Sequence, residues 1–302
     1  MPELPEVETV RRSLEPVLVG RRILKVDLAR PGLRLPFPGH FAHRLQGRTV
    51  TALARRAKYL IARLSSGESW LIHLGMTGRF TIIAPNGRPH GLGEFYYETA
   101  ADAVARGPHD HVAIDLEDGW RLIYTDPRRF GLMDLIAPGA EASHPLLKDL
   151  GIEPLGNEMN AQTLAKALRG KKAPLKAALL DQKIIAGLGN IYVCEALFRA
   201  RLSPIAPAGS LVTRAGGPRL GLERLVGAIR AVLTEALAAG GSTLRDYAGA
   251  DGAPGRFQQH FDVYDRAGEA CTRPGCGGTV ERLVQAGRST FWCPRCQRRG
   301  DP

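Results

Sequence analysis

Residues 112–125, VAIDLEDGWRLIYT, carry the clearest fold signal in the chain. Apolar residues alternate with mostly small or polar ones on both sides of the dipeptide Asp118-Gly119. A period of two is typical of a strand with one buried face, and Asp-Gly between two such runs favours a tight hairpin. This stretch therefore predicts a β-hairpin within an antiparallel sheet.

The sequence on either side of this hairpin extends the pattern. Further strands are expected at 23–28, 49–64, 69–74, 78–83 and 131–136, with a long loop at 85–108. Residues 3–14 instead space their apolar side chains as a helix does, and acidic residues near the start suit the helix dipole. The first part of the chain is thus predicted to be one helix followed by an antiparallel β-sandwich.

Helical spacing replaces strand alternation in the second half. Residues 137–157 show no regular period, and helices are predicted over 160–169, 173–183, 190–200 and 218–239. The predicted fold class is therefore α+β. The expected domains are the helix and sandwich (1–137), a linker (138–158), a helical domain (159–261) and a cysteine-rich module (262–302).

The chain of 302 residues is basic, with 41 Lys and Arg against 30 Asp and Glu, a net charge of +11 and a pI near 9.8. Residues 1–150 hold 20 basic and 17 acidic residues, whereas residues 151–302 hold 21 and 13. This charge indicates a polyanionic partner, with nucleic acid ahead of an acidic membrane. No apolar run approaches the ~20 residues that span a bilayer, and the N-terminus lacks a secretory signal.

Four of the five cysteines form two short pairs near the C-terminus: Cys271 with Cys276, and Cys293 with Cys296. Two such pairs can supply the four soft ligands of a tetrahedral Zn²⁺ site. Two strand-like stretches and a turn at residues 285–288 separate the pairs, so a zinc ribbon with one structural ion is predicted. The fifth, Cys194, lies on an apolar helix face and is expected to be a core thiol. This use of cysteine indicates a reducing compartment.

The N-terminus offers a candidate nucleophile. Removal of the initiator Met would leave Pro2 with a free secondary amine, which can attack an aldehyde-level carbon and form a cationic iminium. Its ordinary pKa near ~8 leaves a neutral fraction at pH 7, and the adjacent Glu3 can act as an acid or base. A simpler interpretation is helix capping, which these two residues alone would favour.

Six motifs, taken together, favour the chemical interpretation. They are Pro2–Glu8, Arg56–Leu60, His73–Gly78, Asp126–Gly131, Gly187–Tyr192 and the four-cysteine module. In this order they resemble the formamidopyrimidine-DNA glycosylase family, bacterial enzymes that remove oxidised purines, over essentially the whole chain. The sister endonuclease VIII family usually has Gly in place of Leu4 and lacks the paired Met and Arg-x-Phe elements, so the resemblance favours the purine-type enzyme.

The resemblance implies catalytic roles for four residues. Pro2 corresponds to the nucleophile that attacks the deoxyribose C1′ and forms a Schiff base, and Glu3 to the acid/base that assists sugar-ring opening. Lys58 corresponds to a proton-transferring lysine; without the resemblance, a surface lysine at a strand end would be preferred. Arg288, at the tip of the ribbon, corresponds to an arginine that contacts phosphates and assists elimination. The iminium acidifies the C2′ proton, so glycosylase and lyase activities follow from one intermediate.

The resemblance also implies how DNA is held. The damaged base must leave the duplex, at a cost of about a few kcal/mol, and three residues are expected to fill the space it leaves: Met76, Arg128 and Phe130. Met76 and Phe130 could instead be sheet core, although their Gly and Pro neighbours indicate loops. Gly187–Asn190 resembles the turn of a helix-two-turn-helix motif, so the helical domain is expected to be a helix-two-turn-helix DNA-binding domain. The expected backbone contacts are His109, Lys172 and Asn190, with Lys176 near the lesion. The segment 240–256 corresponds to a lesion-capping loop.

The sequence therefore predicts a bifunctional glycosylase and lyase of base excision repair that acts on oxidised purines in damaged double-stranded DNA. It is expected to act as a monomer in the bacterial cytoplasm, associated with the nucleoid when bound to DNA, without a nucleotide cofactor or a membrane partner. Two alternatives remain: an endonuclease VIII-like enzyme for oxidised pyrimidines, and a non-catalytic zinc-ribbon protein that binds DNA.

Overall fold

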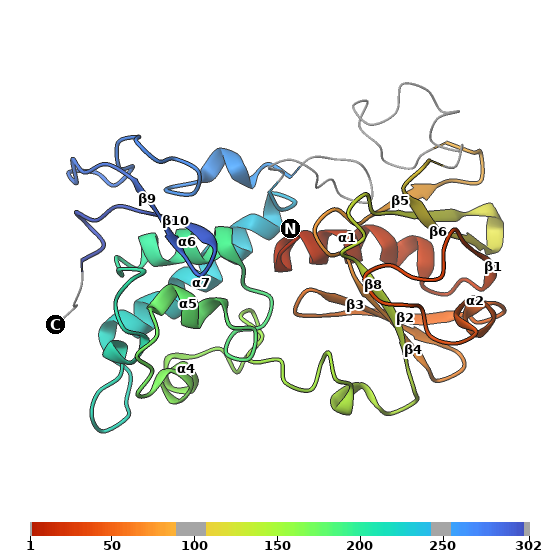
Figure 1. The fold of residues 1–302 in the computed structure, drawn as a ribbon, viewed down its shortest axis with the longest axis horizontal. Helices are drawn as coiled ribbons and strands as arrows, with labels where there is room; N and C mark the ends of the chain where they lie inside the picture. Colours follow the sequence, from red (N-terminus) through yellow and green to blue (C-terminus); the bar gives the residue numbers. More distant parts are fainter. Residues whose placement is uncertain (1, 89–106, 243–254, 299–302) are drawn as a thin grey trace. The chain divides into compact units, whose positions relative to one another are not determined.

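The computed structural model describes residues 2–88, 107–242 and 255–298 (Figure 1). The chain forms two compact units, residues 1–148 with 239–256 and residues 149–238 with 257–302. Segment 239–256 thus groups with the first unit, whereas the sequence placed it in the helical domain. One physical reason is Glu6, whose Oε1 accepts a hydrogen bond from the Ser242 amide at 2.8 Å.

The first unit begins with helix α1 (Leu4–Leu18), which is longer than the predicted 3–14 helix. Its N-cap is Glu3, and a capping box joins Glu3 and Glu6. Pro5 is tolerated in the first turn because the amide there has no intrahelical acceptor. The apolar face of α1 is buried in the core of the first unit.

Two four-stranded antiparallel sheets follow α1, so the predicted sandwich is confirmed. The first sheet has the order β1 (Ile23–Leu28), β6 (Asp110–Leu116), β7 (Arg121–Thr125) and β5 (Arg79–Ile83). The second has the order β2 (Val50–Arg56), β3 (Tyr59–Leu64), β4 (Ser69–His73) and β8 (Leu132–Ile136). Val10 of α1, Leu122 of the first sheet and Trp70 of the second belong to one buried cluster. The short helix α2 (Phe41–Leu45), which the sequence did not predict, buries Phe41 and Leu45.

The hairpin predicted over residues 112–125 is present. Strands β6 and β7 pair antiparallel and are joined through the short 3₁₀ turn η1 (Glu117–Gly119). Asp118 and Gly119 have φ values of 62° and 76°. This left-handed conformation suits Gly and is tolerated by Asp, which is why this dipeptide is a strong turn signal.

The second unit contains four helices among the described residues: α4 (Ala161–Leu168), α5 (Leu175–Leu180), α6 (Asn190–Arg199) and α7 (Leu220–Ala238). Helix α5 is shorter than the predicted 173–183 helix. Pro174 is its N-cap, and Asp181 ends it by accepting from the Lys183 amide at 2.9 Å. Short 3₁₀ turns lie at η2 (Glu141–Ser143) in the first unit, and at η3 (Ala208–Leu211) and η4 (Phe257–His260) in the second.

The chain ends in the predicted ribbon, a two-stranded antiparallel hairpin of β9 (Glu281–Gln285) and β10 (Arg288–Trp292). We call this element the ribbon hairpin. Its apolar side packs on α6, where Cys194 and Phe198 share a buried cluster with Phe291. Cys194 is 1% exposed, as expected of a core thiol. Within the residues that the structure describes, no helix has the length and apolar character needed to cross a membrane.

Candidate functional site

The N-terminal end of α1 holds the predicted nucleophile. Pro2 is buried and directly precedes the N-cap Glu3, which is 3% exposed and has an extended backbone (φ −98°, ψ −171°). Glu6 Oε2 accepts from the Glu3 amide at 2.8 Å. Capping and chemistry are therefore compatible here, because the capping box fixes the backbone that carries Pro2.

The second carboxylate oxygen of Glu6 binds the start of the predicted lesion-capping loop. Glu6 Oε1 accepts from the amide of Ser242 at 2.8 Å and from its hydroxyl at 3.1 Å. An antiparallel bridge between Ser242 and Arg256 closes the base of this segment. Residues 243–254 of the predicted 240–256 loop lie outside the described residues. Both ends of the loop therefore start from the part of the first unit that also carries Glu3.

Lys58 lies in the tight turn between β2 and β3 and is only 6% exposed. The turn requires a left-handed residue, and Ala57 supplies it with φ 54°. A lysine in a hairpin turn is ordinarily solvated, so burial of Lys58 marks it as a residue with a specific environment. The low exposure of Lys58 argues against the alternative interpretation, a surface lysine at a strand end.

His73 and Arg34 join this environment, and sequence reasoning missed both. The pKa of His73 is lowered to about 4, first by burial and then by the positive charges of Lys58 and Arg34. Its ring lies 4.9 Å from that of Tyr59, and its Nδ1 accepts from the Gly75 amide at 3.1 Å. Neutral His73 therefore carries its proton on Nε2, where it can donate. His73 belongs to the motif His73–Gly78, in which the sequence predicted Met76 as the functional residue.

Two loops, residues 74–78 and 126–131, carry the three predicted gap-filling residues; we call them the paired loops. Met76 is half-buried, whereas Arg128 and Phe130 are exposed. The Arg128 guanidinium carbon lies 4.8 Å from the centre of the Phe130 ring. A Cβ atom on Gly75 would lie 2.3 Å from the Phe130 carbonyl carbon, so the two loops touch backbone to backbone. Phe130 is 44% exposed and is therefore not sheet core.

His109 is exposed just before β6. Its carbonyl oxygen accepts from the Asp126 amide at 3.0 Å, so it is attached to the second paired loop. His111 is buried, with Nε2 at 2.8 Å from the Asp126 carbonyl oxygen. Among the described residues, the group with metal-ligand geometry is the four-cysteine cluster rather than this histidine pair.

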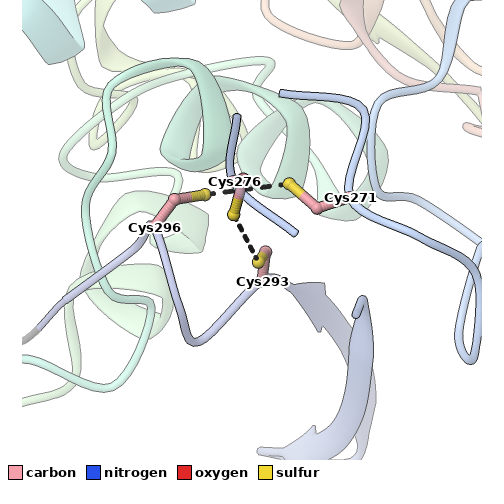
Figure 2. A group of neighbouring side chains, drawn as sticks. All are labelled: Cys271, Cys276, Cys293 and Cys296. Atoms are coloured by element: carbon pink, nitrogen blue, oxygen red, sulfur yellow. Dashed lines mark hydrogen bonds between the residues drawn. The ribbon is translucent and has the colours of Figure 1, made fainter. Parts of the chain in front are cut away.

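The four cysteines of the second unit converge on one point (Figure 2). Their sulfur atoms all lie within 4.8 Å of one another, with 3.9 Å between Cys271 and Cys296 and 3.7 Å between Cys276 and Cys293. Zn–S bonds of about 2.3 Å in a tetrahedron place sulfurs about 3.8 Å apart, so the cluster fits Zn²⁺. A Cβ on Gly278 would lie 2.8 Å from the Cys293 sulfur, which shows how closely the backbone surrounds the site.

Arg288 occupies the tip of the ribbon hairpin, as predicted. It is exposed and pairs with Gln285 across a two-residue turn. Ala286 and Gly287 of that turn have φ values of 48° and 73°. The turn directs the chain back within two residues, which leaves the long cationic side chain of Arg288 at the end of the hairpin.

Lys176 was predicted to lie near the lesion, but its side chain is 0% exposed. Its Nζ donates to the Ser289 carbonyl oxygen at 2.8 Å and to Thr290 Oγ1 at 2.7 Å. Asn190, the first residue of α6, donates from Nδ2 to the same Ser289 oxygen at 3.0 Å. Both side chains therefore attach the ribbon hairpin to the helices. Lys172, in contrast, is exposed to solvent.

Glu195 of α6 is a buried group that sequence reasoning missed. It is 0% exposed, and its carboxylate accepts from the amides of Asp262, Val263 and Tyr264 at 2.8–3.0 Å. Burial raises its pKa, although these three hydrogen bonds act in the opposite direction. Glu195 fixes the segment that leads into the ribbon. No local pattern signals this role, because its partners lie far along the chain.

Three family models match the chain and cover most of it. The formamidopyrimidine-DNA glycosylase N-terminal domain matches residues 1–133. The formamidopyrimidine-DNA glycosylase H2TH domain matches residues 150–248. The zinc finger found in FPG and IleRS matches residues 268–299, which include the four cysteines.

Full-length relatives agree with these matches. The chain is 58% identical to a formamidopyrimidine-DNA glycosylase of Methylobacterium sp. strain 4-46, over 98% of this chain and 99% of that protein. The crystal structure of MutM (Fpg) from Thermus thermophilus is 40% identical, with a TM-score of 0.80, and covers 99% of this chain and 100% of that one. A Lactococcus lactis Fpg variant in complex with DNA containing Fapy-dG is 32% identical, with a TM-score of 0.83 and the same coverage.

Proposed function

Because the chain belongs to the formamidopyrimidine-DNA glycosylase family, we propose that it excises oxidised purines, such as 8-oxoguanine and formamidopyrimidines, from double-stranded DNA and then cleaves the strand. It is a DNA glycosylase of base excision repair with one structural Zn²⁺ in its zinc finger. The single observation that carries the chemistry is the buried Pro2 on the capped end of α1, beside Glu3.

The first step uses Pro2 after removal of Met1. The neutral secondary amine attacks C1′ of the damaged nucleotide, the C1′–N bond to the base breaks, and the base leaves with a proton. Opening of the sugar ring then gives an iminium between Pro2 and C1′. Glu3 is positioned by the capping box to protonate the ring oxygen. Lys58 is the expected partner for proton transfer near the lesion.

The second step breaks the DNA strand. The iminium withdraws electrons from C2′, so a base can remove the C2′ proton and expel the 3′ phosphate. Loss of the 5′ phosphate follows by δ-elimination. Exposed Arg288 at the tip of the ribbon hairpin is the proposed contact to the leaving phosphate, because a guanidinium binds phosphate in a bidentate manner.

The paired loops support base eversion. Phe130 offers an exposed ring that can insert between bases, and Met76 offers an unbranched side chain that adapts to a gap. Arg128 stacks over the Phe130 ring, which leaves its N–H groups available to the cytosine that loses its partner. Filling the gap in the base stack and hydrogen bonding to the unpaired cytosine both require side chains on loops that are accessible to DNA.

Phosphate binding is assigned to several cationic or polar groups. Lys58 and Arg34 are the positive charges beside neutral His73 in the first unit. The remaining proposed contacts are His109, Lys172 and Asn190. For Lys176 we propose an indirect role instead of direct contact with DNA, because its ammonium donates hydrogen bonds to two groups of the ribbon hairpin. We further infer a monomer in the cytoplasm that associates with the nucleoid through DNA.

Lesion preference is tested with two duplexes that differ only in the damaged base. Met76 and the Arg128-x-Phe130 element favour 8-oxoguanine opposite cytosine over thymine glycol. We expect faster release of 8-oxoguanine under single-turnover conditions. Faster release of thymine glycol would support the endonuclease VIII-like alternative.

Mass spectrometry of the N-terminus tests the non-catalytic alternative. A retained Met1 would support that alternative, because Met1 would block the Pro2 amine.

A further inference from the structure

We propose that Asp126 is a positioning residue for base eversion: its buried carboxylate fixes the paired loops and so sets Met76, Arg128 and Phe130 in place without touching DNA. The inference rests on the proposed function. It concerns how Met76, Arg128 and Phe130 are held, which family membership does not state. Asp126 itself lies at the end of β7 and is 0% exposed.

The carboxylate of Asp126 binds both paired loops. Its Oδ1 accepts from the Thr77 hydroxyl at 2.6 Å, and its Oδ2 accepts from the Gly131 amide at 2.8 Å. Thr77 directly follows Met76, and Gly131 directly follows Phe130. The Asp126 side chain therefore links Thr77 to Gly131, each of which is next to a proposed gap-filling residue.

A hydrogen-bond relay extends this connection to Arg128. The Thr77 oxygen accepts from the Arg128 amide at 3.2 Å while its hydroxyl proton points to Asp126. An ionised carboxylate only accepts, so it fixes the direction of that hydroxyl and leaves the oxygen lone pairs to Arg128. The turn is completed by Arg129, which has φ 58° and donates its amide to the Asp126 carbonyl oxygen at 3.2 Å.

The surroundings of Asp126 leave little room for an alternative arrangement. A Cβ on Gly131 would lie 1.9 Å from the Tyr124 hydroxyl, and one on Gly78 would lie 2.1 Å from it. The Tyr124 hydroxyl is itself 3.4 Å from Asp126 Oδ2. Burial, together with the charge of Asp126, raises the pKa of Tyr124 well above its ordinary range, so it stays a neutral donor. The Thr77 hydroxyl, the Gly131 amide and the Tyr124 hydroxyl therefore all face the carboxylate as donors.

Two substitutions remove this connection while nearly preserving shape. Asp126→Asn keeps one acceptor oxygen and turns the other into a donor, so the side chain can no longer accept from both the Thr77 hydroxyl and the Gly131 amide. Thr77→Val removes the relay hydroxyl, and Thr77→Ser keeps it, which makes the Thr77 pair a matched control. If Asp126→Asn fails to fold, the Thr77 pair still tests the proposal.

The test uses the full-length, zinc-loaded protein with two duplexes opposite cytosine, one with 8-oxoguanine and one with a preformed abasic site, and with a third duplex that places adenine opposite 8-oxoguanine. We expect Asp126→Asn and Thr77→Val to slow 8-oxoguanine excision about tenfold or more and to weaken discrimination between opposing cytosine and adenine. Cleavage of the abasic site should stay within about threefold, because Pro2 chemistry is intact, and Thr77→Ser should match the wild type.

The proposal is overturned by unchanged excision and unchanged discrimination in Asp126→Asn. It is also overturned by an equal loss on both duplexes, which would mean general damage to the fold, or by a Thr77→Ser defect as large as that of Thr77→Val. Failure of the proposed function looks different, because the wild type itself would then not excise 8-oxoguanine.

Discussion

Asp126 in the first unit and Lys176 in the second are both fully buried charges that hold an exposed functional loop. Asp126 is an acceptor that gathers donors from the paired loops. Lys176 is a donor that gathers acceptors on the ribbon hairpin. Each ion has at least one hydrogen-bond partner far along the chain, Thr77 for Asp126 and Ser289 for Lys176, and these bonds offset the cost of burying charge.

The two loops differ in what else fixes them. The ribbon hairpin is also held by zinc at its base, where the four sulfurs converge. The paired loops have direct backbone contact instead, with Gly75 and Phe130 pressed together. A metal fixes the strands but acts at one end of the hairpin, so Lys176 and Asn190 are needed nearer the tip. The comparison indicates that buried polar groups position the exposed residues, whether or not a metal is present.

Zinc removal should produce the largest effect. Structural zinc contributes about 10–16 kcal/mol in small zinc modules, so chelation should unfold the ribbon while the sandwich keeps its core. DNA affinity, measured by fluorescence anisotropy, should fall at least tenfold and return when zinc is restored. Unchanged affinity in protein shown by elemental analysis to lack zinc would contradict the ribbon's role in binding.

Replacing Lys176 with Met should have the next largest effect. The change removes the buried donor of the Thr290 hydroxyl and leaves the Ser289 carbonyl with Asn190 as its side-chain donor, at a cost of about 2–4 kcal/mol. We expect a lower unfolding temperature and weaker DNA binding, with zinc still bound. Lys172→Met is the matched control, because Lys172 is exposed and should leave stability unchanged. Equal stability of the two variants would show that Lys176 is not an anchor.

The same lysine pair separates positioning from direct phosphate contact. Neutralising Lys172 should weaken binding to all DNA sequences severalfold and reduce the slope of log affinity against log salt by about 0.9. Lys176→Met should weaken binding with a smaller change in slope, since its charge does not meet phosphate. Titrations at several salt concentrations measure both slopes. An unchanged slope for the Lys172 variant would remove it from the interface.

His73 should give the smallest effect, and unlike Asp126 and Lys176 it is a partly buried group that stays neutral. Its folded-state pKa of about 4 lies below the ordinary 6.5, so the unfolded chain binds more protons between these pH values. The free energy of unfolding should therefore decrease as pH falls from about 6.5 to about 4. Denaturant unfolding of the wild type and His73→Gln across this range isolates the contribution. Parallel pH profiles would contradict the partly buried, neutral His73.

Local chemistry could be predicted from the sequence. Asp118-Gly119 adopts the positive φ values that make it a turn signal, and the four cysteines form a metal cluster because their spacing suits two facing turns. The tip position of Arg288 followed from the same ribbon geometry. Each of these features depends on residues close together in the chain.

Long-range placement could not be predicted in this way. Asp126 meets Thr77 across 49 residues, and Lys176 meets Ser289 across 113. Before the fold is known, an Asp in a loop and a Lys on a short helix both look solvated. Lys176 was therefore predicted to be a DNA contact near the lesion from the family resemblance alone, and the roles of Asp126 and Glu195 had no local signal.

Borohydride trapping tests the central claim, that Pro2 forms the covalent intermediate. Wild-type protein is mixed with an 8-oxoguanine duplex in the presence of borohydride, which reduces the iminium to a stable amine, and the adduct is mapped by peptide mass spectrometry. The account predicts a DNA adduct on the nitrogen of Pro2, in a peptide that begins at that residue. An adduct on Lys58, or active enzyme that yields no adduct, would contradict it.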